Sequence, residues 1–181
     1  MFDFSRNHFE LFGLPVGFVI DTTALAARYR ALQQVVHPDR FAADGASSQR
    51  LSLQRATLVN EAYDTLRDPL KRARYLLALK GVEEGPDHQT VSDPAFLMQQ
   101  MELREALAEV RGTADPLAAL DALMREIGGM IRSQVAQLAV QFEDSTPEQL
   151  QAASQTVQRM QFLNRLLAEA EAVEADLEEA V

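Results

Sequence analysis

The tripeptide His37-Pro38-Asp39 combines three side chains that suit a contact with another protein. The imidazole of His37 can donate or accept a hydrogen bond. Pro38 has a fixed φ and restricts the residue before it, so the turn is stiff. Asp39 can accept hydrogen bonds from local amides or from an arginine of a partner. These residue types predict a rigid docking loop. An ordinary helix end followed by a turn explains the local chemistry equally well.

A second group of side chains recurs at helical spacing after Pro94. At about 100° per residue, one stripe contains Phe96, Leu103, Leu107 and Val110, which we expect to face a core. The opposite side carries apolar and acidic residues together: Leu97, Met98, Met101, Glu102, Glu105 and Glu109. An apolar patch with a charged rim is typical of a binding surface, and methionine adapts well to a partner. Packing of the same residues against another helix remains open.

Residues for catalysis or metal binding do not form a recognisable pattern. His8, His37 and His88 are far apart and lack metal-ligand spacing, and the chain has no cysteine. There is no glycine-rich phosphate loop. We therefore expect no enzymatic activity of its own, no metal and no cofactor.

The elements around the tripeptide are predicted to be helices. Leu25, Tyr29, Leu32 and Val36 form the buried stripe of one helix, which Asp21 or Thr22 can cap and Pro38 ends. A second helix spans about 47–67, with one face containing Leu51, Leu58, Ala62 and Leu66. The tripeptide would then lie at the tip of a helical hairpin. A short helix is expected at about 7–12. Another is expected to begin at Pro69, directly after the cap Asp68, and to stop at Gly81.

The remaining chain predicts three more helices, over about 94–111, 116–142 and from 147 almost to the end. Their short connections favour an antiparallel bundle, with Gly128-Gly129 as a weak point in the middle helix. Residues 81–93 contain two glycines and a proline without periodicity and predict a linker. The expected fold is all-α, with one module at 1–80 and another at 94–181.

Charge is divided unevenly between these modules. Residues 1–80 contain 11 Lys and Arg against 8 Asp and Glu, whereas residues 94–181 contain 6 against 15. The acidic module fits a basic partner surface, and a net charge of −10 argues against nucleic acid. No secretion signal or membrane span is evident, and the lack of cysteine suits the cytoplasm.

The first 80 residues resemble a J domain, the module that stimulates DnaK-type ATPases. The resemblance covers FELFGL (9–14), HPDRF (37–41), NEAYDTLRDP (60–69) and RARYLLAL (72–79). The remainder, including TVSDPAFLMQQMELREAL (90–107), is similar to the bacterial HscB family of J-domain co-chaperones. That family delivers an IscU-type iron–sulfur scaffold to an HscA-type, DnaK-like chaperone.

The resemblance implies two binding sites and no catalytic residue. The implied chaperone-binding residues are His37, Pro38, Asp39, Arg28, Arg30 and Arg40. The implied scaffold-binding residues are Leu97, Met98, Met101, Glu102, Glu105, Glu109 and Phe162. Gln33 and Gln34 replace the basic residues of many J domains, which weakens the expected electrostatic part of docking. The alternative is a general J-domain co-chaperone that serves other clients.

Overall fold

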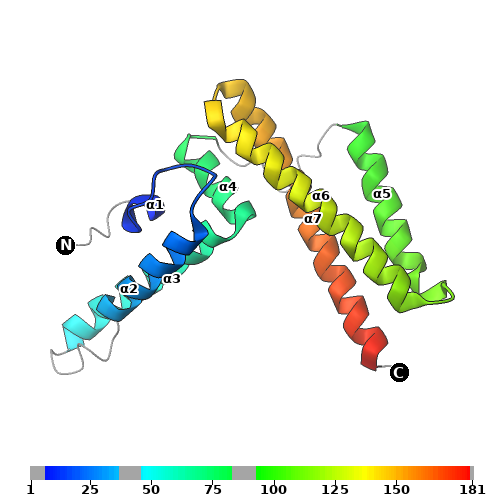
Figure 1. Ribbon diagram of the computed structural model, residues 1–181, viewed down its shortest axis with the longest axis horizontal. Coiled ribbons are helices and arrows are strands. Elements are labelled where there is room, and N and C mark those ends of the chain that lie inside the picture. The colour runs from blue at the N-terminus through cyan, green and yellow to red at the C-terminus, as the bar shows by residue number, and fades with distance from the viewer. Residues whose placement is uncertain (1–6, 37–45, 83–92, 180–181) are drawn as a thin grey trace. The chain divides into compact units, whose positions relative to one another are not determined.

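The computed structural model describes residues 7–36, 46–82 and 93–179. Within these ranges every regular element is helical, which confirms the predicted all-α fold. The chain divides into two compact units, Met1–Leu79 and Lys80–Val181, which are described separately below. The described residues form four α-helices in the first unit and three long α-helices in the second, which Figure 1 labels α1 to α7.

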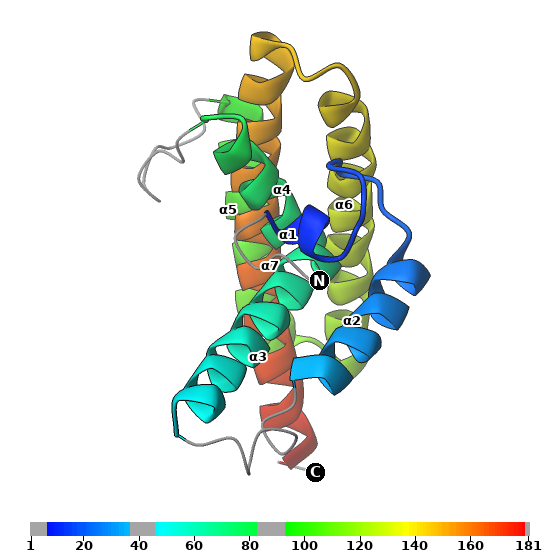
Figure 2. The same ribbon diagram turned by 90° about the vertical axis from the view of Figure 1, so that its left-hand side faces the viewer.

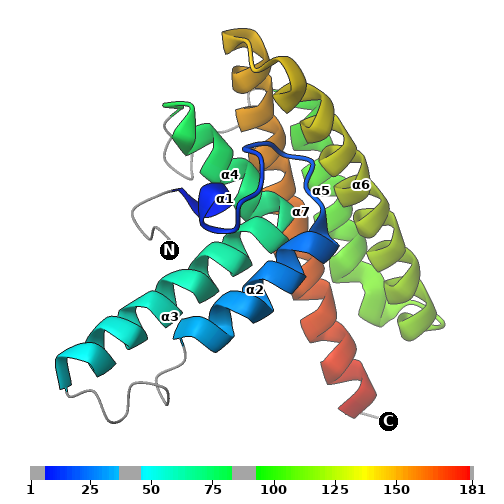
Figure 3. The same cartoon turned by 60° about the vertical axis from the view of Figure 1, so that its left-hand side comes forward.

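The first unit contains α1 (His8–Leu11), α2 (Thr22–Val36), α3 (Ala46–Arg67) and α4 (Pro69–Leu79). Helices α2 and α3 lie side by side as a hairpin (Figures 2 and 3). The predicted caps are present: Asp21 accepts from the Ala24 amide at 2.9 Å, and Asp68 accepts from the Lys71 amide at 2.8 Å. These side chains satisfy amides that the first turn of each helix leaves free.

The inward face of the hairpin follows the prediction on α2 more closely than on α3. Leu25, Leu32 and Val36 are buried. Of the residues that the sequence groups on one face of α3, Ala62 and Leu66 are buried, whereas Leu51 is 46% exposed. The neighbouring Ser52 occupies the inward position instead, where its hydroxyl donates to the Val36 carbonyl at 2.6 Å.

The second unit contains α5 (Pro94–Glu109), a 3₁₀ turn η2 (Val110–Gly112), α6 (Pro116–Asp144) and α7 (Pro147–Glu179). All three long helices begin with proline at the first position, where its missing N–H costs nothing. Helices α6 and α7 form a hairpin through Ser145, whose left-handed φ of 48° ends α6. Figure 1 shows α5 lying alongside this hairpin.

The core of this bundle includes residues from all three long helices and η2. Its buried members are Phe96, Leu103, Val110, Leu120, Leu123, Ile127, Phe162, Leu163, Leu166 and Ala170. Helix α6 continues unbroken through Gly128 and Gly129, so these glycines do not interrupt it. Helix α5 thus packs against a continuous hairpin that α6 and α7 form.

Candidate partner-binding site

The outward face of α5 consists of the six apolar and acidic residues that its periodicity predicted: Leu97, Met98, Met101, Glu102, Glu105 and Glu109. All six are exposed, and Met98 and Met101 are exposed by 64% and 72%. Leu97 is exposed by 37%. Of the two alternatives that the sequence left open for these residues, exposure and packing against another helix, the structure has exposure. Large apolar side chains and carboxylates share one accessible surface, which we call the α5 outward face.

The opposite side of α5 packs into the bundle, as its stripe predicted. Phe96, Leu103 and Val110 are buried. Phe162 of α7 meets Phe96 edge to face, with ring centroids 5.8 Å apart. Edge-to-face packing is a favourable arrangement for two aromatic rings. Both rings therefore fix the contact between α5 and α7.

Phe162 lies in the core and outside the α5 outward face. Its side chain is only 8% exposed. The guanidinium of Arg104 lies over its ring at 5.7 Å from the centroid. Arg104 itself is exposed on α5. Phe162 therefore contacts α5 from the core side, next to the outward face.

Two ion pairs attach α5 to α7 near its two ends. Asp93 pairs with Arg159 at 2.7 Å, and Arg111 pairs with Asp176 at 2.9 Å. The partners are 18 residues apart from 93 to 111 and 17 residues apart from 159 to 176. Nearly equal spacing means that the two helices run parallel in register, because each residue adds the same rise. The direction in which the α5 outward face points is thereby fixed.

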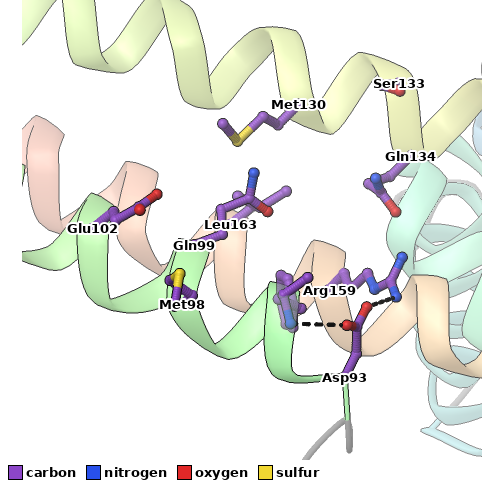
Figure 4. Close-up of a pocket in the computed structure, with 11 residues that line it drawn as sticks. Asp93, Met98, Gln99, Glu102, Met130, Ser133, Gln134, Arg159 and Leu163 are labelled. Atoms are coloured by element: carbon purple, nitrogen blue, oxygen red, sulfur yellow. Dashed lines mark hydrogen bonds and ion pairs between the residues drawn. The ribbon is translucent and has the colours of Figure 1, made fainter.

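A groove lies between α5 and α6, with α7 as its floor (Figure 4). Its volume is about 560 Å³. The lining side chains come from all three helices: Asp93, Ala95, Phe96, Met98, Gln99, Glu102, Met130, Ser133, Gln134, Arg159 and Leu163. Met98 and Glu102 belong both to this groove, called the α5–α6 groove, and to the α5 outward face.

The first unit contains the other predicted site residues. His37, Pro38, Asp39 and Arg40 lie outside the described residues. Arg30 is exposed on α2. The predicted role of these residues stays a prediction.

Arg28 and Tyr29 have partners within the first unit. Arg28 donates to the carbonyl of Phe12 at 2.6 Å and to that of Gly13, at the end of α1. Tyr29 stacks on Tyr63 at 4.0 Å and donates from its hydroxyl to Asn60 at 3.0 Å. Arg28 thus has a capping role that the sequence pattern did not reveal.

Neither a metal cluster nor a membrane helix is found in the described part of the chain. No group of three His, Asp or Glu side chains there is arranged to hold a metal ion. None of the helices in these ranges has a stretch long and apolar enough to cross a bilayer.

Comparison with known proteins gives consistent relatives over almost the whole chain. Residues 92–171 match the family model described as the HSCB C-terminal oligomerisation domain. The chain is 46% identical over 169 residues to "Co-chaperone protein HscB homolog" of Burkholderia mallei, covering 93% of this chain and 94% of the relative.

Solved structures agree with this relationship. The chaperone HscB from Vibrio cholerae matches with a TM-score of 0.84 at 42% identity, covering 95% of this chain and 99% of that one. The human co-chaperone protein HscB matches with a TM-score of 0.86 at 30% identity, covering 95% and 84%. The chain therefore belongs to the HscB family of co-chaperone proteins.

Proposed function

We propose that this co-chaperone binds an IscU-type iron–sulfur scaffold with its second unit and delivers it, in the cytoplasm, to an HscA-type, DnaK-like chaperone. The first unit would stimulate the ATPase of that chaperone. The observation that supports the proposal best is the α5 outward face, where Leu97, Met98 and Met101 are exposed on a helix that the bundle holds in a fixed orientation. Family membership supports the co-chaperone role itself.

The α5 outward face has the composition of a protein-binding surface. Its apolar side chains can be buried by a partner, which is the main source of binding energy at most interfaces. Glu102, Glu105 and Glu109 are exposed beside them. Carboxylates at a rim accelerate association with a basic surface more than they prolong the complex. We therefore assign the apolar residues to affinity and the carboxylates to association rate.

The chaperone-binding end would consist of the loop His37-Pro38-Asp39 with the cations Arg28, Arg30 and Arg40. The loop would contact the ATPase and favour the state that hydrolyses ATP, through contacts that differ between the two states of the chaperone. Arg28 also supports the end of α1, so Arg30 is the better probe of a purely electrostatic contribution.

Scaffold binding is tested by the double substitution Leu97→Ala with Met98→Ala. Truncation of a hot-spot residue near the centre of an interface costs about 2 kcal/mol or more, so the dissociation constant should rise at least about tenfold. Val140→Ala is the matched control, because Val140 is 64% exposed on α6 and lies outside both surfaces. Unchanged scaffold affinity in the double variant, measured by calorimetry, would refute the assignment of this face.

ATPase stimulation is tested with His37→Gln, and His88→Gln provides the same chemical change at another position of the chain. We expect His37→Gln to abolish stimulation of an HscA-type chaperone and His88→Gln to retain it. No stimulation by the unaltered chain would contradict the co-chaperone mechanism. Stimulation without any scaffold binding would favour the alternative, a general J-domain co-chaperone for other clients.

A further inference from the structure

The α5–α6 groove extends the α5 outward face onto a second helix. Met98 and Glu102 belong to both surfaces, and Met130, Ser133 and Gln134 of α6 form the opposite wall. Figure 4 shows Met130 pointing from α6 into the space above Gln99 and Leu163. The volume of about 560 Å³ falls within the range of roughly 300–1,000 Å³ that is usual for binding clefts. The groove can therefore accept a side chain together with some of its backbone.

The lining changes in chemistry from one end of the groove to the other. Met98, Met130 and Leu163 make the middle apolar, and the two methionines can adapt to the shape of an inserted group. The exposed carboxylate of Glu102 lies at one end. Figure 4 shows the Asp93–Arg159 ion pair at the other end.

The end near Arg159 has unused hydrogen-bonding capacity. Among the described residues, Gln134 Oε1 and Arg159 Nε are buried without a hydrogen-bond partner. Such atoms are costly to leave unpaired. A carboxamide rotates easily about its last torsion, so Gln134 can turn to meet an incoming peptide amide. A peptide N–H that donates to Gln134 Oε1 therefore suits this end.

We propose that the α5–α6 groove holds an apolar side chain of the iron–sulfur scaffold that is followed by a lysine or arginine. This inference rests on the proposed function and extends its site from α5 to α6. The apolar side chain would lie between Met98 and Met130, the adjacent backbone would face Gln134, and the cation would reach Glu102. The acidic balance of residues 94–181 favours a basic segment over an acidic one.

The first test uses the absence of cysteine from the chain. Ser133→Cys and Ala136→Cys each introduce a single thiol at an exposed position of α6, and only position 133 lines the groove. The rate of alkylation by iodoacetamide, followed by mass spectrometry, should fall about tenfold at position 133 when scaffold saturates the full chain. The rate at position 136 should stay unchanged. Equal rates at position 133 with and without bound scaffold would overturn the inference.

A photo-activated cross-linker on the same thiol at position 133 identifies the occupant. The cross-linked scaffold peptide should contain an apolar residue next to lysine or arginine. A cross-link confined to an acidic peptide would overturn the proposed occupant.

Blocking the groove separates this inference from the proposed function. Ser133→Phe places a ring in the groove, whereas Ala136→Phe places the same ring on α6 outside it. We expect scaffold affinity to fall about tenfold for Ser133→Phe and to be retained for Ala136→Phe, with unchanged helicity in both. If Leu97→Ala with Met98→Ala loses affinity but Ser133→Phe does not, the groove inference fails and the proposed function stands. If the unaltered chain does not bind scaffold, both fail.

Discussion

Gly128 and Gly129 lie in the interior of α6, where alanine should be more stable. A Cβ added at Gly128 would meet only Arg132 Nη1 at 3.5 Å, and one added at Gly129 would meet only Arg132 Nη2 at 3.7 Å. Both distances are ordinary van der Waals contacts with a flexible side chain. Glycine in a helix interior is about 0.8–1.0 kcal/mol less favourable than alanine. Each substitution to alanine should therefore raise the free energy of unfolding of the second unit by about 1 kcal/mol, and the pair by about 2 kcal/mol.

Hydrogen exchange of the α6 amides measures this effect locally, because a signal from total helicity would mix the two units. Since about 1.4 kcal/mol corresponds to a tenfold change, the double variant should slow the most protected α6 amides by about 30-fold. Ala136→Gly, the reverse change on the same helix, should accelerate them by about fivefold. Unchanged or faster exchange in the glycine-to-alanine variants would refute the reasoning, because it would show that the bundle needs positions 128 and 129 to lack a Cβ atom.

Three further changes test how the helices are held. Asp93→Ala removes both the cap on α5 and the pair with Arg159, so urea denaturation should show a loss of about 1–2 kcal/mol, and Asp93→Asn should retain the cap and lose less. Burial lowers the pKa of His8 below its ordinary 6.5, so the unfolded chain takes up a proton first as the pH falls. Urea midpoints of the first unit should therefore decrease from about pH 6.5 down to the folded-state pKa and then level off, and His8→Gln should abolish this dependence. Arg28→Met removes a donor to two carbonyls at the end of α1 and should cost about 1–2 kcal/mol, with faster amide exchange in α1 as the readout.

The fold was predictable where helix signals are local. Asp93, Asp115 and the prolines after them marked helix starts within one residue, because a cap and its amides are close in sequence. The two faces of α5 were predictable for a related reason. Its apolar residues follow the period of 3.6 residues per turn, and Phe96 and Met98 therefore had to point in different directions.

The remaining features depend on contacts between residues that are distant in sequence. Phe162 is buried by contacts with residues from other helices, such as its edge-to-face contact with Phe96. Leu51 and Ser52 are neighbours, and the hydrogen bond from Ser52 to Val36 turns the serine inward. The wall of the α5–α6 groove on α6 had no signal in the sequence, because Met130 and Gln134 are ordinary residues for a bundle helix.

The Asp93–Arg159 pair also sets the rotational phase of α5. Every residue after Asp93 is turned about 100° from the one before it, and Phe96 follows Asp93 by three residues. An insertion before Asp93 would leave this phase unchanged. A single residue inserted between Asp93 and Phe96 would rotate the rest of α5 by more than a quarter turn relative to Asp93. Positions that are now buried would then become accessible. The phase of α5 thus does not depend on the length of chain before Asp93, whereas the spacing after that residue decides which side chains of α5 are buried and which are exposed.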